Sequence, residues 1–167
     1  MNSLPIISTE QLATLIGEPG IKILDCSVAM GRPEGDCCRI NYHKSHIRGA
    51  QFMDLDNLKD MKSDLPFMMP SEEQFIGKMK TLGVKMSDQV VCYDTGAMQF
   101  FGYRAAWMLQ AMGHPNVQVL DGGFPKWVKE GLPVHSSDRD FTPKDFGYKL
   151  QSEKVWNLEK VKAFEGA

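Results

Sequence analysis

Apolar positions along the first 134 residues follow two different periods. Short β-branched runs occupy residues 21–25, 89–93 and 117–120, and polar residues or glycine bound each one. Such runs predict strands that are buried on both faces. At residues 101–112 apolar side chains recur every three or four positions, which predicts a helix that ends at Gly113. Strands alternating with helices predict an α/β fold with a mainly parallel sheet and helices on both faces.

Two stretches match the capping box of helix starts. Residues 8–11 and 71–74 each begin with serine and end with glutamine. In such a box the serine side chain accepts from the backbone N–H of the glutamine, and the glutamine side chain accepts from the backbone N–H of the serine. The first box predicts a helix at residues 9–16, and the second predicts a helix that runs to about Leu82. A short helix is also predicted at residues 124–130.

The intervening segments are less regular. Residues 30–39 are polar and contain glycine and proline, so they are predicted to form a loop. Residues 46–54 are predicted to form a turn that leads into a strand, and residues 57–70 are irregular. No internal repeat is apparent.

The character of the chain changes after Pro133. Residues 135–149 are polar without a clear period, and residues 155–164 predict the start of a helix. We therefore divide the chain into a domain at 1–134 and a linker at 135–167, which we expect to lead into a second domain.

Composition excludes several classes of protein. The chain has 167 residues, of which 43% are hydrophobic, enough for one packed core. A net charge of −2 gives no reason to expect nucleic acid or an anionic membrane as a partner. No apolar run approaches the roughly 20 residues that span a bilayer. The N-terminus resembles neither a secretory signal nor an arginine-rich transit peptide.

The most informative stretch is residues 89–96, where an apolar strand ends in a loop that leads into a helix. In open α/β sheets, ligands bind beyond the carboxyl ends of the strands. A side chain at position 94 would lie there, close to the positive end of the following helix. A cysteine at this position would be activated as a thiolate, but the chain has Asp94.

Several phrases of the sequence resemble, in order, those of the rhodanese-like domain family. They are residues 46–50 (HIRGA), 82–84 (LGV), 90–94 (VVCYD), 103–109 (YRAAWML), 113–114 (GH) and 119–127 (VLDGGFPKW). The match covers roughly residues 7–134. Within the family, these phrases most resemble the first of the two domains in thiosulfate and 3-mercaptopyruvate sulfurtransferases. The resemblance implies a five-stranded, mainly parallel sheet flanked by helices.

The resemblance also implies a function. In this family only the second domain carries the cysteine that takes sulfur as a persulfide and passes it to cyanide or a thiol. The first domain has an aspartate after the equivalent strand, and Asp94 corresponds to it in this chain. This chain alone is therefore expected to be inactive and to form one wall of the cleft between the domains. The implied candidates on that wall are Asp56, Asp94, Thr95 and Gly96.

The chain departs from the family pattern at two places. Arg48 replaces the usual proline of the HIPGA phrase. In the mercaptopyruvate branch a histidine belongs in the phrase matched by residues 63–70, but Phe67 stands there. The second aspartate of a Phe-x-Asp-x-Asp phrase faces the cleft in that branch, and Asp56 matches it.

Each candidate also has a structural interpretation. Asp94 could orient a group at the strand end, but a carboxylate bound to backbone N–H groups is favoured. Cys92 is predicted to be a core residue. Cys37 and Cys38 are predicted on an exposed loop beside Arg39, where a sulfur-carrying thiol remains an alternative.

Other conspicuous side chains have structural interpretations too. His46 is predicted to bind backbone, and His114 to be a partly positive residue at a helix end. Arg104 could bind an anion, although pairing with Asp25 or Asp121 is favoured. Trp107 and Trp127 are expected in the core.

Three hypotheses remain. The first is the silent domain of a tandem sulfurtransferase whose partner is the catalytic domain. The second is a stand-alone structural or protein-binding subunit of a larger assembly. The third is an enzyme that uses Cys37 or Cys38 as sulfur acceptor. No histidine, cysteine and aspartate set has metal-ligand spacing, so neither a metal nor another cofactor is expected. Cysteine usage favours an intracellular site, either the mitochondrion or the cytoplasm.

Overall fold

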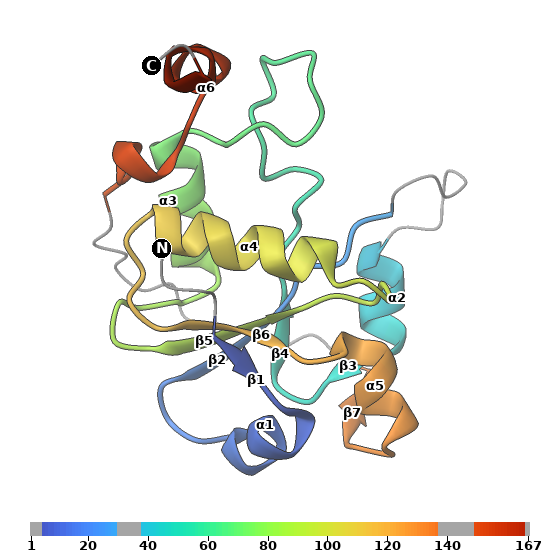
Figure 1. The fold of residues 1–167 in the computed structure, drawn as a ribbon. Helices are drawn as coiled ribbons and strands as arrows, with labels where there is room; N and C mark the ends of the chain where they lie inside the picture. Colours follow the sequence, from blue (N-terminus) through green and yellow to red (C-terminus); the bar gives the residue numbers. More distant parts are fainter. Residues whose placement is uncertain (1–4, 30–37, 137–148, 166–167) are drawn as a thin grey trace.

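The sheet is parallel, as predicted. The computed structural model describes residues 5–29, 38–136 and 149–165, and five strands form one sheet in the order β1-β6-β5-β2-β4 (Figure 1). Every pairing in this sheet is parallel. The strands are β1 (Ile6–Ile7), β2 (Ile21–Asp25), β4 (Ala50–Phe52), β5 (Gln89–Tyr93) and β6 (Val117–Leu120). The α/β fold predicted from the sequence is confirmed.

Alternate residues of the strands face two layers of helices. Leu24 and Cys92 contribute to a core cluster with α3 (Glu72–Thr81) and α4 (Phe100–Ala111). Their neighbours Ile23 and Val91 contribute to a second cluster on the opposite face. The helices of that second face are α1 (Thr9–Leu15), α2 (Cys38–Lys44) and α5 (Gly123–Lys129).

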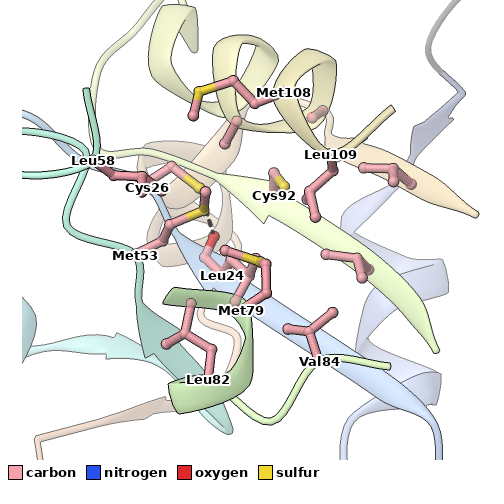
Figure 2. Close-up of a cluster of buried hydrophobic side chains, with 14 of the residues drawn as sticks. Leu24, Cys26, Met53, Leu58, Met79, Leu82, Val84, Cys92, Met108 and Leu109 are labelled. Atoms are coloured by element: carbon pink, nitrogen blue, oxygen red, sulfur yellow. Dashed lines mark hydrogen bonds between the residues drawn. The ribbon is translucent and has the colours of Figure 1, made fainter. Parts of the chain in front are cut away.

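The face beneath α3 and α4 is rich in sulfur (Figure 2). Cys26 and Cys92 lie in it with Met79 and Met108, and all four side chains are fully buried. Burial raises the pKa of the Cys26 thiol well above its usual range, and the neighbouring Cys92 raises it further. The predicted core role of Cys92 is confirmed.

The two capping boxes form to different extents. Ser8 Oγ accepts from Gln11 N at 3.1 Å, and Ser8 N donates to Gln11 Oε1 at 3.0 Å, so the first box is complete. Ser71 Oγ accepts from Gln74 N at 3.2 Å. The Gln74 side chain, however, donates to the carbonyl of Asn57 at 3.1 Å. The second box is therefore half formed, because the Gln74 side chain binds a carbonyl of the irregular 57–70 segment instead of accepting from Ser71 N.

One prediction about the cysteines is wrong. Cys38 begins helix α2 and is only 3% exposed, whereas a loop position was predicted. Cys38 and Tyr42 are four residues apart, so they lie on one helix face and both join the second core cluster. The Tyr42 hydroxyl fixes the helix by donating to Ala50 O at 2.8 Å. Cys37 and the rest of the predicted loop at 30–37 lie outside the described residues.

Three two-residue strands were not predicted: β1, β3 and β7. β3 (His46–Ile47) and β7 (Val134–His135) pair antiparallel and form a separate sheet. Two-residue strands are too short to show a period.

The chain after β7 contains a 3₁₀ turn, η1 (Ser152–Lys154), and α6 (Leu158–Glu165), which confirms the helix predicted there. Just before η1, Gln151 N donates to Ala111 O at 2.8 Å, and Leu150 packs against the first core cluster. Among the described helices, none has the length and hydropathy needed to cross a membrane.

Candidate functional site

Strands β2, β4 and β5 all end at one edge of the sheet, and backbone hydrogen bonds join the segments that follow them. Cys26 N donates to Tyr93 O, and Met53 N donates to Asp25 O, both at 2.8 Å. The loop at residues 94–99, which follows β5, therefore starts from a fixed position beside the end of β2.

The carboxylate of Asp94 binds the start of helix α4. Its Oδ2 accepts from the backbone N–H groups of Phe101 and Gly102, each at 2.9 Å, and its Oδ1 accepts from Gly96 N at 2.6 Å. Asp94 is only 2% exposed. The structural interpretation of Asp94, a loop carboxylate bound to backbone N–H groups, is confirmed.

Gln99 completes this loop in a way that the sequence analysis missed. Its Oε1 accepts from Asp94 N at 2.9 Å, and its Nε2 donates to the carbonyls of Asp94 and Gly96. The backbone of Gln99 is left-handed, with φ of 53°. Such a conformation costs free energy in a non-glycine residue, so the side-chain hydrogen bonds must offset that cost. A single glutamine before an apolar helix gives no signal for this role.

A second buried aspartate supports the loop from β2. Asp25 is 1% exposed, and its Oδ1 accepts from Ser27 N at 3.0 Å and from Ser27 Oγ at 2.6 Å. Ser27 Oγ in turn accepts from Thr95 N at 3.1 Å. Asp25 thus positions Thr95 through Ser27.

Burial has the largest effect on the pKa values of Asp25 and Asp94. It raises the pKa of Asp25 and of Asp94 above the usual range, although hydrogen bonds to each carboxylate oppose the change. Both oxygens of Asp94 are engaged by backbone N–H groups. This arrangement stabilises the loop, and it leaves no thiol at the position next to the helix terminus.

A small cavity of about 210 Å³ opens at this loop, between residues 27–28 and residues 94–101. Three of the four predicted site residues, Asp94, Thr95 and Gly96, line it together. Asp56 lies half-buried in the segment that follows β4 and is not among the lining residues. Across the described residues, no cluster of three or more histidine, cysteine or acidic side chains could hold a metal ion.

The predicted partner of Arg104 is wrong. Its guanidinium donates to the carbonyls of Phe67 and Met68 and lies 5.8 Å from the Phe67 ring centre. Asp25 instead binds Ser27, and Asp121 pairs with a lysine of α5. Burial lowers the pKa of Arg104. Arg104 therefore fastens the 57–70 segment to α4 and does not form the predicted ion pair.

The two predicted histidines are structural. His46 Nδ1 lies 2.6 Å from Tyr42 O, as expected for a backbone contact. His114 Nδ1 accepts from Asn116 N at 3.2 Å, and Nε2 lies 3.1 Å from Lys85 O. These contacts fit a neutral ring, and burial lowers the pKa of His114. The partly positive charge predicted for this residue is therefore wrong.

Of the two tryptophans expected in the core, Trp127 is fully buried and Trp107 is partly buried. Trp127 is fully buried, and its Nε1 donates to Pro133 O at 3.0 Å. Trp107 is partly buried and packs against the first core cluster.

The fold and this loop can now be compared with known proteins. A family model of the rhodanese-like domain matches residues 8–130. The chain belongs to the rhodanese-like domain family. It is 35% identical over 179 residues to thiosulfate/3-mercaptopyruvate sulfurtransferase 1, mitochondrial, of Arabidopsis thaliana. That match covers 95% of this chain and 47% of the relative.

Solved structures of rhodanese-like proteins have the same fold as this chain. SseA of Escherichia coli, described as having the rhodanese fold of 3-mercaptopyruvate sulfotransferases, gives a TM-score of 0.90 at 30% identity, over 98% of this chain and 62% of that one. The sub-stoichiometric sulfur transferase subunit of yeast mitochondrial complex I gives 0.85 at 28% identity, over 97% and 57%. The chain spans about half the length of the curated relatives it matches.

Proposed function

We propose that this chain is the non-catalytic rhodanese-like domain of a tandem thiosulfate/3-mercaptopyruvate sulfurtransferase. Its role is to form one wall of the cleft in which the partner domain transfers sulfur. The observation that carries the proposal is Asp94, whose carboxylate occupies the N–H groups at the start of α4. Sulfur transfer needs a nucleophilic thiolate, and none lies in this loop.

The surface around the loop supports a partner on the same side. Met98, Phe100 and Tyr103 are exposed apolar residues in or just beyond the 94–99 loop. The contact of Phe67 with Phe101, whose ring centres are 5.4 Å apart, brings the 57–70 segment against the same helix end. That segment adds further exposed apolar side chains, Met61, Leu65 and Met68. Exposed apolar surface beside a site is typical of an interface.

The first test is activity of the 167-residue chain alone. We expect no thiocyanate from thiosulfate and cyanide, and no pyruvate from mercaptopyruvate. The matched control replaces Cys37 and Cys38 by serine. It tests the hypothesis that one of these cysteines is the sulfur acceptor of an enzyme. Mass spectrometry should show no added sulfur on Cys38, since this thiol is buried, and none on Cys37. Turnover by the chain that disappears in the serine variant would refute the silent-domain proposal.

The second test concerns the cleft wall. In a polypeptide that includes the catalytic domain, we expect Asp56→Ala to raise KM with little change in kcat, because Asp56 would face substrate rather than the reacting sulfur. Asp64→Ala is the matched control, since Asp64 is an exposed carboxylate of the neighbouring segment. Equal kinetics of the two variants would remove Asp56 from the cleft wall.

The alternative is a stand-alone protein-binding subunit. The sulfur transferase subunit of yeast mitochondrial complex I, similar in fold, favours it because that protein is part of an assembly. The coding frame beyond Ala167 separates the two candidates. A second domain with a cysteine loop supports the tandem enzyme, and a stop codon supports the subunit. Either candidate is compatible with the predicted mitochondrial or cytoplasmic location.

A further inference from the structure

Most polar side chains that line the cavity beside Asp94 already hold the loop together. Both oxygens of Asp94 accept from backbone N–H groups. The Gln99 side chain binds the N–H and the carbonyl of Asp94. The Ser27 hydroxyl donates to Asp25 and accepts from Thr95 N. These three side chains are therefore committed to the structure of the loop itself.

The hydroxyl of Thr95 is the exception. Thr95 is half-buried and lines the cavity, and its hydroxyl makes no hydrogen bond to any residue that the structure describes. A hydroxyl can both donate and accept a hydrogen bond. Thr95 can therefore bind a polar atom of a ligand without the loss of an existing hydrogen bond.

The charges around the cavity disfavour an anion. Among the described residues that line it, Asp94 is the only ionisable one, and none is basic. The N–H groups of Gly96, Phe101 and Gly102, which could have bound an anion, already bind Asp94. An anionic ligand would lie beside a carboxylate without a neighbouring cation, and such a placement of like charges costs free energy.

The remaining walls of the cavity are mostly apolar, and they include Val28, Met98, Phe100 and Phe101. Met98 and Phe100 are 68% and 65% exposed, so they lie at the rim. Aromatic rings make favourable contacts with sulfur. The volume of about 210 Å³ lies below the roughly 300 Å³ at which pockets for drug-sized ligands begin, so the ligand must be small.

We propose that this cavity binds the sulfur acceptor, and that the acceptor is a small uncharged thiol. The inference rests on the proposed function, because the sulfur comes from a persulfide on the catalytic cysteine of the partner domain. The acceptor thiol loses its proton to water, and its sulfur forms a bond to the outer sulfur of the persulfide. The bond between the two persulfide sulfurs breaks and the cysteine leaves as a thiolate, so no external oxidant or reductant is needed.

The test compares two thiols of similar size in the 167-residue chain. At about pH 7 β-mercaptoethanol is uncharged, whereas mercaptoacetate carries a carboxylate. NMR titrations follow the backbone amides of Thr95 and Gly96. We expect β-mercaptoethanol to shift both amides in a saturable way, and mercaptoacetate to bind about tenfold or more weakly. Ethylene glycol, which has no sulfur to contact the rings, should bind about threefold or more weakly than β-mercaptoethanol.

Two variants assign these differences to single groups. Thr95→Val keeps the shape of the side chain and removes the hydroxyl, so the affinity for β-mercaptoethanol should fall about fivefold. Thr81→Val, at an exposed position of α3, is the matched control and should leave the affinity unchanged. Asp94→Asn removes the charge, so mercaptoacetate should then bind within about threefold of β-mercaptoethanol.

Four results would overturn the inference. They are equal affinities for the two thiols, the lack of a saturable shift at Thr95 and Gly96, ethylene glycol binding as well as the thiol, and discrimination that persists in Asp94→Asn. The first three results come from the unaltered chain, so they do not depend on how well a variant folds.

Kinetics of a polypeptide that includes the catalytic domain separate this inference from the proposed function. Thr95→Val should raise KM for β-mercaptoethanol about fivefold, with little change in kcat or in KM for the sulfur donor. Unchanged KM in an active polypeptide would refute only the acceptor site. A polypeptide that transfers no sulfur, although the 167-residue chain binds the thiol as expected, would refute the proposed function and leave the thiol site in place.

Discussion

Strands β2 and β5 lie side by side in the sheet, and a buried aspartate stands at the end of each, yet the two carboxylates bind different groups. Asp25 is the last residue of β2 and lies opposite Tyr93, the last residue of β5, whereas Asp94 comes one position after the end of β5. Asp25 accepts hydrogen bonds from Ser27, and Asp94 accepts them from the first turn of α4. The two aspartates thus differ by one residue in their position relative to the strand end. The earlier one, Asp25, binds the loop after its own strand, and the later one, Asp94, binds the start of helix α4.

The comparison shows how an acidic side chain of the protein itself can satisfy the N–H groups at a helix start. The N–H groups at a helix start favour an anion. In this chain the protein's own Asp94 supplies that anion, and Asp25 holds the loop in place through Ser27 and Thr95. Both aspartates are therefore expected to matter for stability, and to different degrees.

The largest effect is expected from Asp25→Ala. The substitution would leave the N–H and the hydroxyl of Ser27 without their acceptor. Because these groups are buried, the free energy of unfolding should fall by about 3 kcal/mol, as measured by urea denaturation. Asp64→Ala on the exposed 57–70 segment should change it by less than about 0.5 kcal/mol. Equal effects of the two variants would contradict a supporting role for Asp25.

The next effect is that of Asp94→Ala, which removes the acceptor of three backbone N–H groups. Loss of a helix cap should lower the free energy of unfolding by about 2 kcal/mol. Asp94→Asn should cost less, because its remaining oxygen can still accept from Phe101 and Gly102. An alanine variant as stable as the original protein would show that water replaces the carboxylate without loss.

Gln99 sharpens the comparison, since among the residues that the structure describes a left-handed glutamine occurs only in the loop beyond β5. Gln99→Ala loses the side-chain hydrogen bonds and keeps the strained backbone, whereas Gln99→Gly relieves the strain. We expect the glycine variant to be the more stable of the two by about 1 kcal/mol in thermal or urea unfolding. The same pair at Met98, whose φ is not positive, should show no advantage for glycine. Alanine matching or exceeding glycine at position 99 would argue against strain in this loop.

The sequence predicted the elements that are long enough to show a period. The strands around residues 89–93 and 117–120 and the helix near 101–112 were confirmed to within about two residues. Helix α2 escaped prediction because its buried side, Cys38 and Tyr42, spans only one turn.

The candidate site was predicted for the part that depends on strand position alone. Asp94 follows β5 by one residue, so its place at the sheet edge could be inferred. Gln99 and Ser27 could not be, because their hydrogen bonds depend on how the loop backbone turns. Arg104 was misassigned for a related reason. Phe67 has a left-handed backbone, with φ of 54°, and its carbonyl accepts from the guanidinium in place of a carboxylate.

The smallest expected effect is a dependence on pH, and it tests whether burial or hydrogen bonding controls Asp94. Burial raises the pKa of Asp94 in the folded protein above the value of 3.8 expected for the unfolded chain. The folded state therefore keeps its proton where the unfolded state has released it, so this group stabilises the fold most below the unfolded pKa. Its contribution falls as pH rises from 3.8 through the folded pKa, and it is constant above that.

Asp94→Asn has no such titration, so the stability difference between the original protein and this variant should be larger at about pH 3.5 than at about pH 7. Urea denaturation at the two pH values measures it, and Asp64→Asn, at an exposed position, serves as the control. A difference that instead grows with pH would mean that the backbone N–H groups outweigh burial and lower the pKa. The pKa of Asp94 would then shift in the direction opposite to that of Asp25, and the two carboxylates would differ in this respect as well as in their partners.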